Sequence, residues 1–363
     1  MSDTPELVKA PCANCGSEML FESGTTALKC PFCGHQQDID TTATVVHQER
    51  SFHDVVAELS NSAGEGLKAE GRKEYSCDTC GASASVPADQ VVIKCEFCGN
   101  QTVNEGAKQT RGISPQGLLP FKLKKKQAVE NFREWIGKGL FHPNDLKKVT
   151  DVKELHEVYV PYWTYDALTY SHWTAEAGYY YYVETTNDKG EKVQERRVRW
   201  EPASGSLTKY FDDVLVIASK GVTQHRAERI FPYKLQEAVD YQPEFLLGKT
   251  AELYELDVEQ GYEVADGIMD DEIRSECARQ VPGDTHRNLR VSTNKSNITF
   301  KHLLLPMFIA AYIYNDKSYQ VVVNGETGKI SGEKPLSTIK IIIAVVLGLA
   351  LVAGLYYAYQ TLK

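Results

Sequence analysis

The sequence contains none of the short motifs that mark a common catalytic site. G-x-S-x-G, H-E-x-x-H, the protein-kinase set and a dinucleotide-binding fingerprint are all absent. The nine histidines are scattered, with none at metal-ligand spacing. G-E-T-G-K at 325–329 is not a P-loop, because it lacks a glycine five residues before Gly328 and a Ser or Thr after Lys329. An enzyme is therefore not the expected function, and a cryptic active site in the middle of the chain is the remaining enzymatic alternative.

The chain also lacks a net positive charge, a long low-complexity tract and an N-terminal signal peptide. Its formal net charge is −9 over 363 residues, whereas modules that bind nucleic acid are usually basic where they touch phosphate. The first ten residues are polar and acidic, with no positive or apolar region of the kind that directs secretion. We therefore expect the cysteines to remain in a reducing compartment, where thiolates bind zinc.

Eight of the nine cysteines form two copies of one pattern, C-x2-C-x14-C-x2-C. The second copy follows the first by 65 residues at every position, and a glycine follows each C-x-x-C pair. The predicted metal ligands are Cys12, Cys15, Cys30, Cys33, Cys77, Cys80, Cys95 and Cys98.

Zinc binds four thiolates as a tetrahedron, and two residues between cysteines let one tight turn supply two of them. Fourteen residues are enough for a β-hairpin that brings the second turn back to the first. The pattern predicts two structural Zn²⁺ sites in zinc ribbons, the layout of a small zinc finger, in which metal replaces a hydrophobic core. A redox dithiol is the rival interpretation, and the surrounding sequence lacks the βαβ pattern it would require.

Charge favours a protein partner or a purely structural role for these ribbons over nucleic acid. Residues 1–110 hold 8 Lys+Arg and 16 Asp+Glu, a net of −8. Each zinc with four thiolates adds about −2 more.

The apolar run at 341–359, IIIAVVLGLALVAGLYYAY, has no charged residue. At about 1.5 Å per residue it nearly spans the ~30 Å hydrocarbon core of a membrane. Lys329, Lys334 and Lys340 precede it and only Lys363 follows, so the positive-inside rule places the N-terminal bulk in the cytoplasm. We expect a tail-anchored, single-pass protein of the cell inner membrane.

The middle of the chain alternates helical and strand patterns. Phe52, Val55, Val56 and Leu59 predict a short helix between the ribbons, and Ala128, Val129, Phe132, Trp135 and Ile136 predict a second helix. Residues 233–280 also have a helical pattern, with Cys277 on the apolar face. Dense Tyr, Trp, Val and Thr after 157 predict long antiparallel strands, and the tyrosines at 179–182 are interpreted as a strand buried on two faces. A hairpin over 302–330 turns at Asn315-Asp316.

One stretch of the middle region is basic. Residues 121–148 carry a net charge of +5, and they are either the solvated face of a helix or a contact with anionic lipid.

The chain resembles bacterial membrane-anchored proteins that carry transcription-factor-IIB-type zinc ribbons. The resemblance rests on CANCG and CPFCG, LLPFKL, FREWI, VYVPYWTYDA, LLLPMFIAAYIYN and VVVNGETGKISGEKP, and it spans most of the chain. Such proteins are often labelled primosomal or replication-restart helicase-like. This sequence has neither a Walker lysine loop nor room for helicase domains, so no helicase activity is expected.

The predicted fold is α+β, with two zinc ribbons, a β-rich middle domain and one transmembrane helix. The predicted boundaries are 1–40 for the first ribbon, 41–75 for a linker with a short helix, 76–106 for the second ribbon, 111–335 for the α+β domain and 339–359 for the transmembrane helix. The expected function is a non-enzymatic scaffold that recruits cytoplasmic proteins to the inner face of the membrane. The alternative is a membrane-tethered nucleic-acid-binding protein of the replication or transcription zinc-ribbon type.

Overall fold

The structure is a computed structural model with mixed α+β architecture. It describes residues 10–40, 49–61, 72–77, 82–87, 92–95, 97, 101–103, 113–143, 146, 155–186, 190–315 and 317–361.

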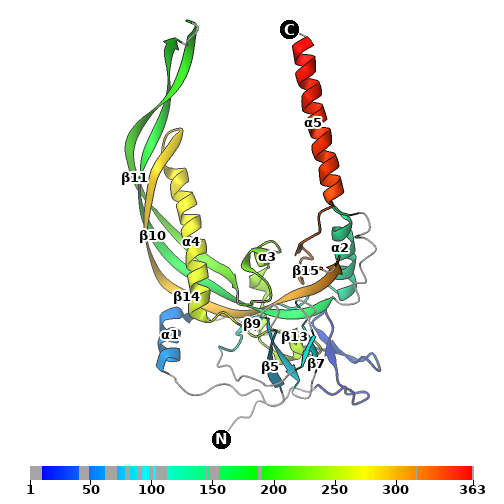
Figure 1. The fold of residues 1–363 in the computed structure, drawn as a ribbon. Coiled ribbons are helices and arrows are strands. Elements are labelled where there is room, and N and C mark those ends of the chain that lie inside the picture. Colours follow the sequence, from blue (N-terminus) through cyan, green and yellow to red (C-terminus); the bar gives the residue numbers. More distant parts are fainter. Residues whose placement is uncertain are drawn as a thin grey trace.

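One curved sheet of nine strands forms the base of the molecule (Figure 1). Its main strands run in the order β11-β10-β14-β15-β16, all antiparallel. They span His156–Thr186 (β10), Lys192–Ile217 (β11), Thr285–Tyr314 (β14), Lys317–Asn324 (β15) and Ile330–Gly332 (β16). Short strands pair at the margins: Arg50–Ser51 (β4), Gly117–Leu118 (β9), Val239–Asp240 (β12) and Thr250–Ala251 (β13).

Of the helices that the structure describes, four pack against the sheet and the last one extends away from it. They span Phe52–Asn61 (α1), Lys125–Gly137 (α2), Gln224–Glu228 (α3), Val258–Gln280 (α4) and Thr338–Thr361 (α5). The predicted helices at α1 and α2 are confirmed, and the apolar face of α4 is buried against the sheet through Val258, Ala265, Met269, Ile273 and Cys277. Between 233 and 257 the helical prediction was wrong, because the chain there forms 3₁₀ turns at Leu235–Glu237 and Pro243–Leu246 and the short strands β12 and β13.

The strands β10 and β11 continue past α4 as a projecting two-stranded arm (Figure 1). Tyr180, Tyr181 and Tyr182 lie on this arm and are 37%, 45% and 63% exposed. The prediction of a two-faced buried strand was wrong here, since β14 pairs with β10 only as far as Gly178 and nothing described covers the ribbon beyond it.

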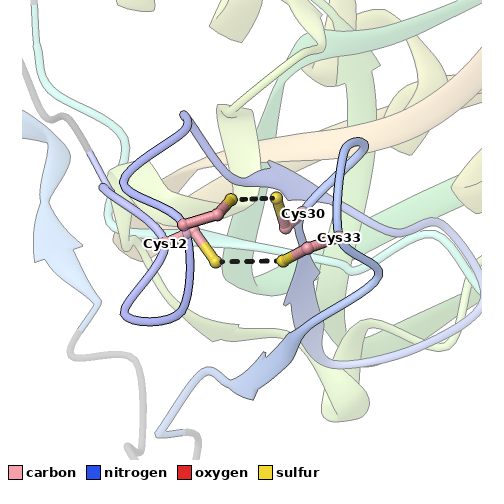
Figure 2. A group of neighbouring side chains, drawn as sticks. Cys12, Cys30 and Cys33 are labelled. Atoms are coloured by element: carbon pink, nitrogen blue, oxygen red, sulfur yellow. Dashed lines mark hydrogen bonds between the residues drawn. The ribbon is translucent and has the colours of Figure 1, made fainter.

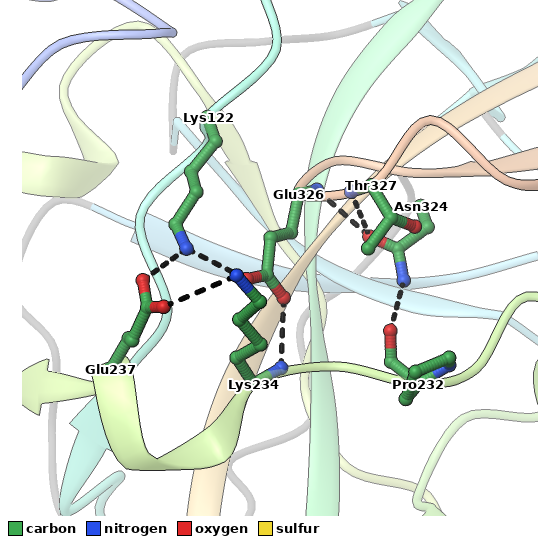
Figure 3. A network of polar contacts seen from close by, with 7 residues as sticks. All are labelled: Lys122, Pro232, Lys234, Glu237, Asn324, Glu326 and Thr327. Carbon is green, nitrogen blue, oxygen red and sulfur yellow. Dashed lines mark hydrogen bonds and ion pairs between the residues drawn. The ribbon is translucent and has the colours of Figure 1, made fainter.

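The turn between β15 and β16 is fastened to the rest of the domain by a polar network (Figure 3). The buried Glu326 carboxylate accepts hydrogen bonds from Lys122 Nζ (2.7 Å) and from the Lys234 backbone N–H (2.9 Å). Lys122 also pairs with Glu237. Burial disfavours the charged form of Lys122, but Glu237 and Glu326 outweigh it and raise the lysine's pKa. Glu326 therefore holds this turn in place.

Helix α5 leaves the base on the side that carries α2 and α4, whereas α1 and the short strands next to the cysteines lie on the other side (Figure 1). The segment Thr338–Gln360 is long and apolar enough to cross a membrane, and its most apolar part is not buried against the rest of the protein. The N–H of Ser337 donates to Phe141 O (2.7 Å), and Lys340 Nζ donates to His142 O (2.8 Å), so the start of α5 is held beside the end of α2.

Candidate metal centre

Residues 10–40, here called the first cysteine module, form a small antiparallel sheet with two tight turns. Its strands are Leu20–Phe21 (β1), Ala27–Lys29 (β2) and Gln36–Asp38 (β3). Each turn contains one C-x-x-C pair and the glycine after it, and is called a knuckle. The four cysteine sulfurs lie within 4.8 Å of one another.

The two knuckles have the same backbone geometry. In the first, Gly16 N–H donates to Cys12 O and Cys12 N–H donates to Ser17 O; in the second, Gly34 N–H donates to Cys30 O and Cys30 N–H donates to His35 O. Gly16 and Gly34 have φ of +74° and +76°. A Cβ at either glycine would meet no atom within 4 Å, so the left-handed backbone itself is what requires glycine.

The spacing of the sulfurs fits a tetrahedral metal site. Cys12 Sγ lies 3.6 Å from Cys33 Sγ, and Cys15 Sγ lies 3.5 Å from Cys30 Sγ (Figure 2). Four sulfurs at about 2.3 Å from a zinc ion would lie about 3.8 Å apart. A disulfide would bring two sulfurs to about 2.05 Å, so these cysteines are free thiols. The group therefore could hold a metal ion, and its four soft donors favour zinc.

The thiols of the metal-free cluster differ in acidity. Burial raises the pKa of Cys12 to about 11. Hydrogen bonds from Ser17 lower the pKa of Cys15 to about 6, and the backbone N–H of His35 lowers that of Cys33. Cys15 and Cys33 face solvent while Cys12 and Cys30 are buried. Metal binding would deprotonate all four thiols and leave no ligand position for water or substrate.

The hairpin end of the first cysteine module is joined to the main core. Phe21 packs edge-to-face on Phe245 at 5.1 Å, and its N–H donates to Leu247 O. Met19, Leu28, Cys12 and Cys30 share one buried cluster with residues of the sheet and α2. The knuckle residues Ala13–Gly16 and Pro31–Gly34 stay largely exposed.

The second copy of the pattern, here called the second cysteine module, is described in part. Its strands are Arg72–Ser76 (β5), Ser83–Pro87 (β6), Val92–Lys94 (β7) and Gln101–Val103 (β8). Cys77 and Cys95 are buried, and Cys77 N–H donates to Ala82 O (2.9 Å), the same contact as Cys12 to Ser17. Cys80 and Cys98 lie outside the described residues, so the second four-cysteine site stays a prediction.

Sequence reasoning identified the four clustered cysteines of the first module, but not the residues on which the two modules pack. Phe245 and Leu247 hold the first module, while Gly221 and Gln320 contact the second. None of the four belongs to a motif, and each lies far along the chain from the cysteines, so no local signal could have revealed it.

The chain is similar to a protein of Bacillus subtilis (strain 168) described as uncharacterized protein YdjG. The two are 26% identical over 337 residues, which is 92% of each chain. No protein-family model matches the sequence. No solved structure matches it either.

Proposed function

We propose that this chain is a membrane-anchored, non-enzymatic docking protein of the type that carries zinc ribbons of the transcription-factor-IIB kind. In this proposal α5 spans the inner membrane, the bulk of the chain lies in the cytoplasm, and the cysteine modules bind structural zinc. The observation that carries it is the position of the first cysteine module, whose exposed knuckles stand on the side of the sheet opposite α5 (Figure 1).

The charge of the first cysteine module supports a protein partner. Residues 10–40 contain one lysine and four carboxylates, a net of −3, and zinc with four thiolates would add about −2. Such a surface repels the phosphates of nucleic acid and of anionic lipid. Within the basic stretch at 121–148, Lys122 is already paired with Glu237 and Glu326, and Lys138 with Glu134.

The experiment that tests this function compares partner recovery from detergent-solubilised membranes for three forms of the full chain. These are the wild type, Cys12→Ser/Cys15→Ser, and the control Cys277→Ser, whose thiol is buried under α4 away from the modules. We expect the double variant to lose zinc and its protein partner, and the control to keep both. A partner set that is the same in all three forms would refute recruitment by the first cysteine module.

A further inference from the structure

The two cysteine modules place equivalent phenylalanines in opposite environments. Phe32 and Phe97 both stand immediately before the last cysteine of their pattern, 65 residues apart. Phe97 is 2% exposed, whereas Phe32 is 81% exposed. One sequence pattern therefore yields a buried phenylalanine in one copy and an exposed phenylalanine within a knuckle in the other.

Phe97 occupies a seat made by small residues and an amide. A Cβ built on Gly221 would lie 2.5 Å from the Phe97 ring and 2.7 Å from Ala82, so glycine is needed for this close approach. Gln320 Nε2 donates both to Phe97 O (3.0 Å) and to Gly221 O (2.9 Å). Phe97 thus packs against small residues, Gly221 and Ala82, and its carbonyl oxygen accepts a hydrogen bond from a side-chain amide.

The modules also differ in which of their described residues pack against the domain. In the described part of the second cysteine module, a cluster shared with the sheet buries Cys77, Ala82, Cys95 and Phe97. In the first, another cluster buries Cys12, Met19, Phe21, Leu28 and Cys30, while Phe32 stays exposed. Phe32 is therefore available to a partner while Phe97 is used within the chain.

We propose that Phe32 is the anchor by which the first cysteine module docks a protein partner. This rests on the proposed function and specifies the site. The partner presents an apolar pocket floored by Gly or Ala, a hydrogen-bond donor for the Phe32 carbonyl, and a rim of Lys or Arg that matches the acidic module. A second copy of the module carries the same negative charge and is disfavoured as occupant. Aromatic residues of this kind dominate the energy of many interfaces.

The test is photo-crosslinking in cells that make the full-length chain. p-Benzoylphenylalanine replaces Phe32, and in a matched control it replaces Leu140, which is also 81% exposed but lies near the start of α5. We expect a discrete protein adduct at position 32 and none at 140. The crosslinked peptide, identified by mass spectrometry, is expected to lie in an apolar site bordered by basic residues. With the purified partner, Phe32→Ser is expected to weaken binding at least tenfold without changing zinc content, and Leu140→Ser to leave it unchanged.

The outcomes separate this inference from the function on which it rests. Loss of the partner in Cys12→Ser/Cys15→Ser but not in Phe32→Ser would overturn the anchor and leave recruitment intact. An unchanged partner in both variants would overturn both. An adduct at position 32 to lipid, to nucleic acid or to another copy of the chain would overturn the proposed chemistry of the occupant.

Discussion

The carboxyl group of Asp166 lies beside that of Glu49, where the segment before α1 meets the sheet. Asp166 sits at a bulge of β10 and is 1% exposed. Its Oδ1 accepts the Asp213 N–H at 2.7 Å, while Lys301 pairs with both Glu49 and Asp213. Burial, together with the Glu49 carboxylate, raises the pKa of Asp166 to about 7. A single lysine thus faces three acids, one of which holds its proton near neutral pH.

Asp166→Asn is therefore expected to change how stability depends on pH. The folded pKa lies above the unfolded value of about 3.9, so between these values the folded state binds more protons and stability falls as pH rises from about 4 to about 7. Asparagine cannot ionise, so the variant should gain stability relative to the wild type between pH 5 and pH 8. The measurement is the thermal midpoint of both proteins in detergent at each pH. A constant difference between them would contradict the raised pKa.

Replacing the knuckle glycines should weaken metal binding through the backbone alone. Gly16→Ala and Gly34→Ala meet no steric obstacle, but each forces alanine into the left-handed region at a cost of about 1 kcal/mol. We expect each variant to release zinc to a chelator roughly fivefold more readily. Gly267→Ala is the matched control, because Gly267 lies in open space within α4, where alanine favours the helix. Equal zinc retention in all three variants would show that the positive φ is not needed.

Zinc stoichiometry tests the prediction that both modules bind metal. We expect two zinc ions per chain in the wild type and one in either Cys12→Ser or Cys77→Ser, measured by elemental analysis after gel filtration. Cys277→Ser should keep two, since that thiol lies in the core beneath α4. A wild type with a single zinc that only Cys12→Ser removes would restrict the metal to the first cysteine module.

The features that the sequence predicted correctly depend on local spacing. Two residues between cysteines, with a glycine after them, predict the two knuckles of the first cysteine module. The three-to-four-residue spacing of apolar residues such as Val258, Ala265 and Met269 predicts the buried face of α4. The hairpin turn near Asn315 was also predicted from neighbouring residues, and the strands β14 and β15 pair on either side of it.

What could not be predicted depends on contacts between distant segments. Tyr180–Tyr182 have the composition of a buried strand, yet β14 begins at Thr285 and leaves them uncovered. Nothing in the sequence around Glu49 indicates that it lies beside Asp166, because the two come together only where β4 pairs with β14. Likewise, Phe32 and Phe97 occupy the same position of the same motif. They differ in exposure because Phe97 packs against Gly221, which is distant in the sequence.

The anchoring role of α5 predicts a strong effect of charge at its centre. Each arginine at the middle of a spanning helix costs about 2.5–3.5 kcal/mol of insertion free energy, so Leu349→Arg/Val352→Arg should move a large share of the protein from the membrane to the soluble or aggregated fraction. Leu140→Arg/Leu336→Arg is the control, because both leucines are exposed and lie outside α5. The measurement is the protein retained in membranes after alkaline carbonate extraction. If the α5 variant is retained as well as the control, α5 is not the membrane anchor. The position of the first cysteine module opposite α5 would then no longer indicate that its knuckles face away from the membrane.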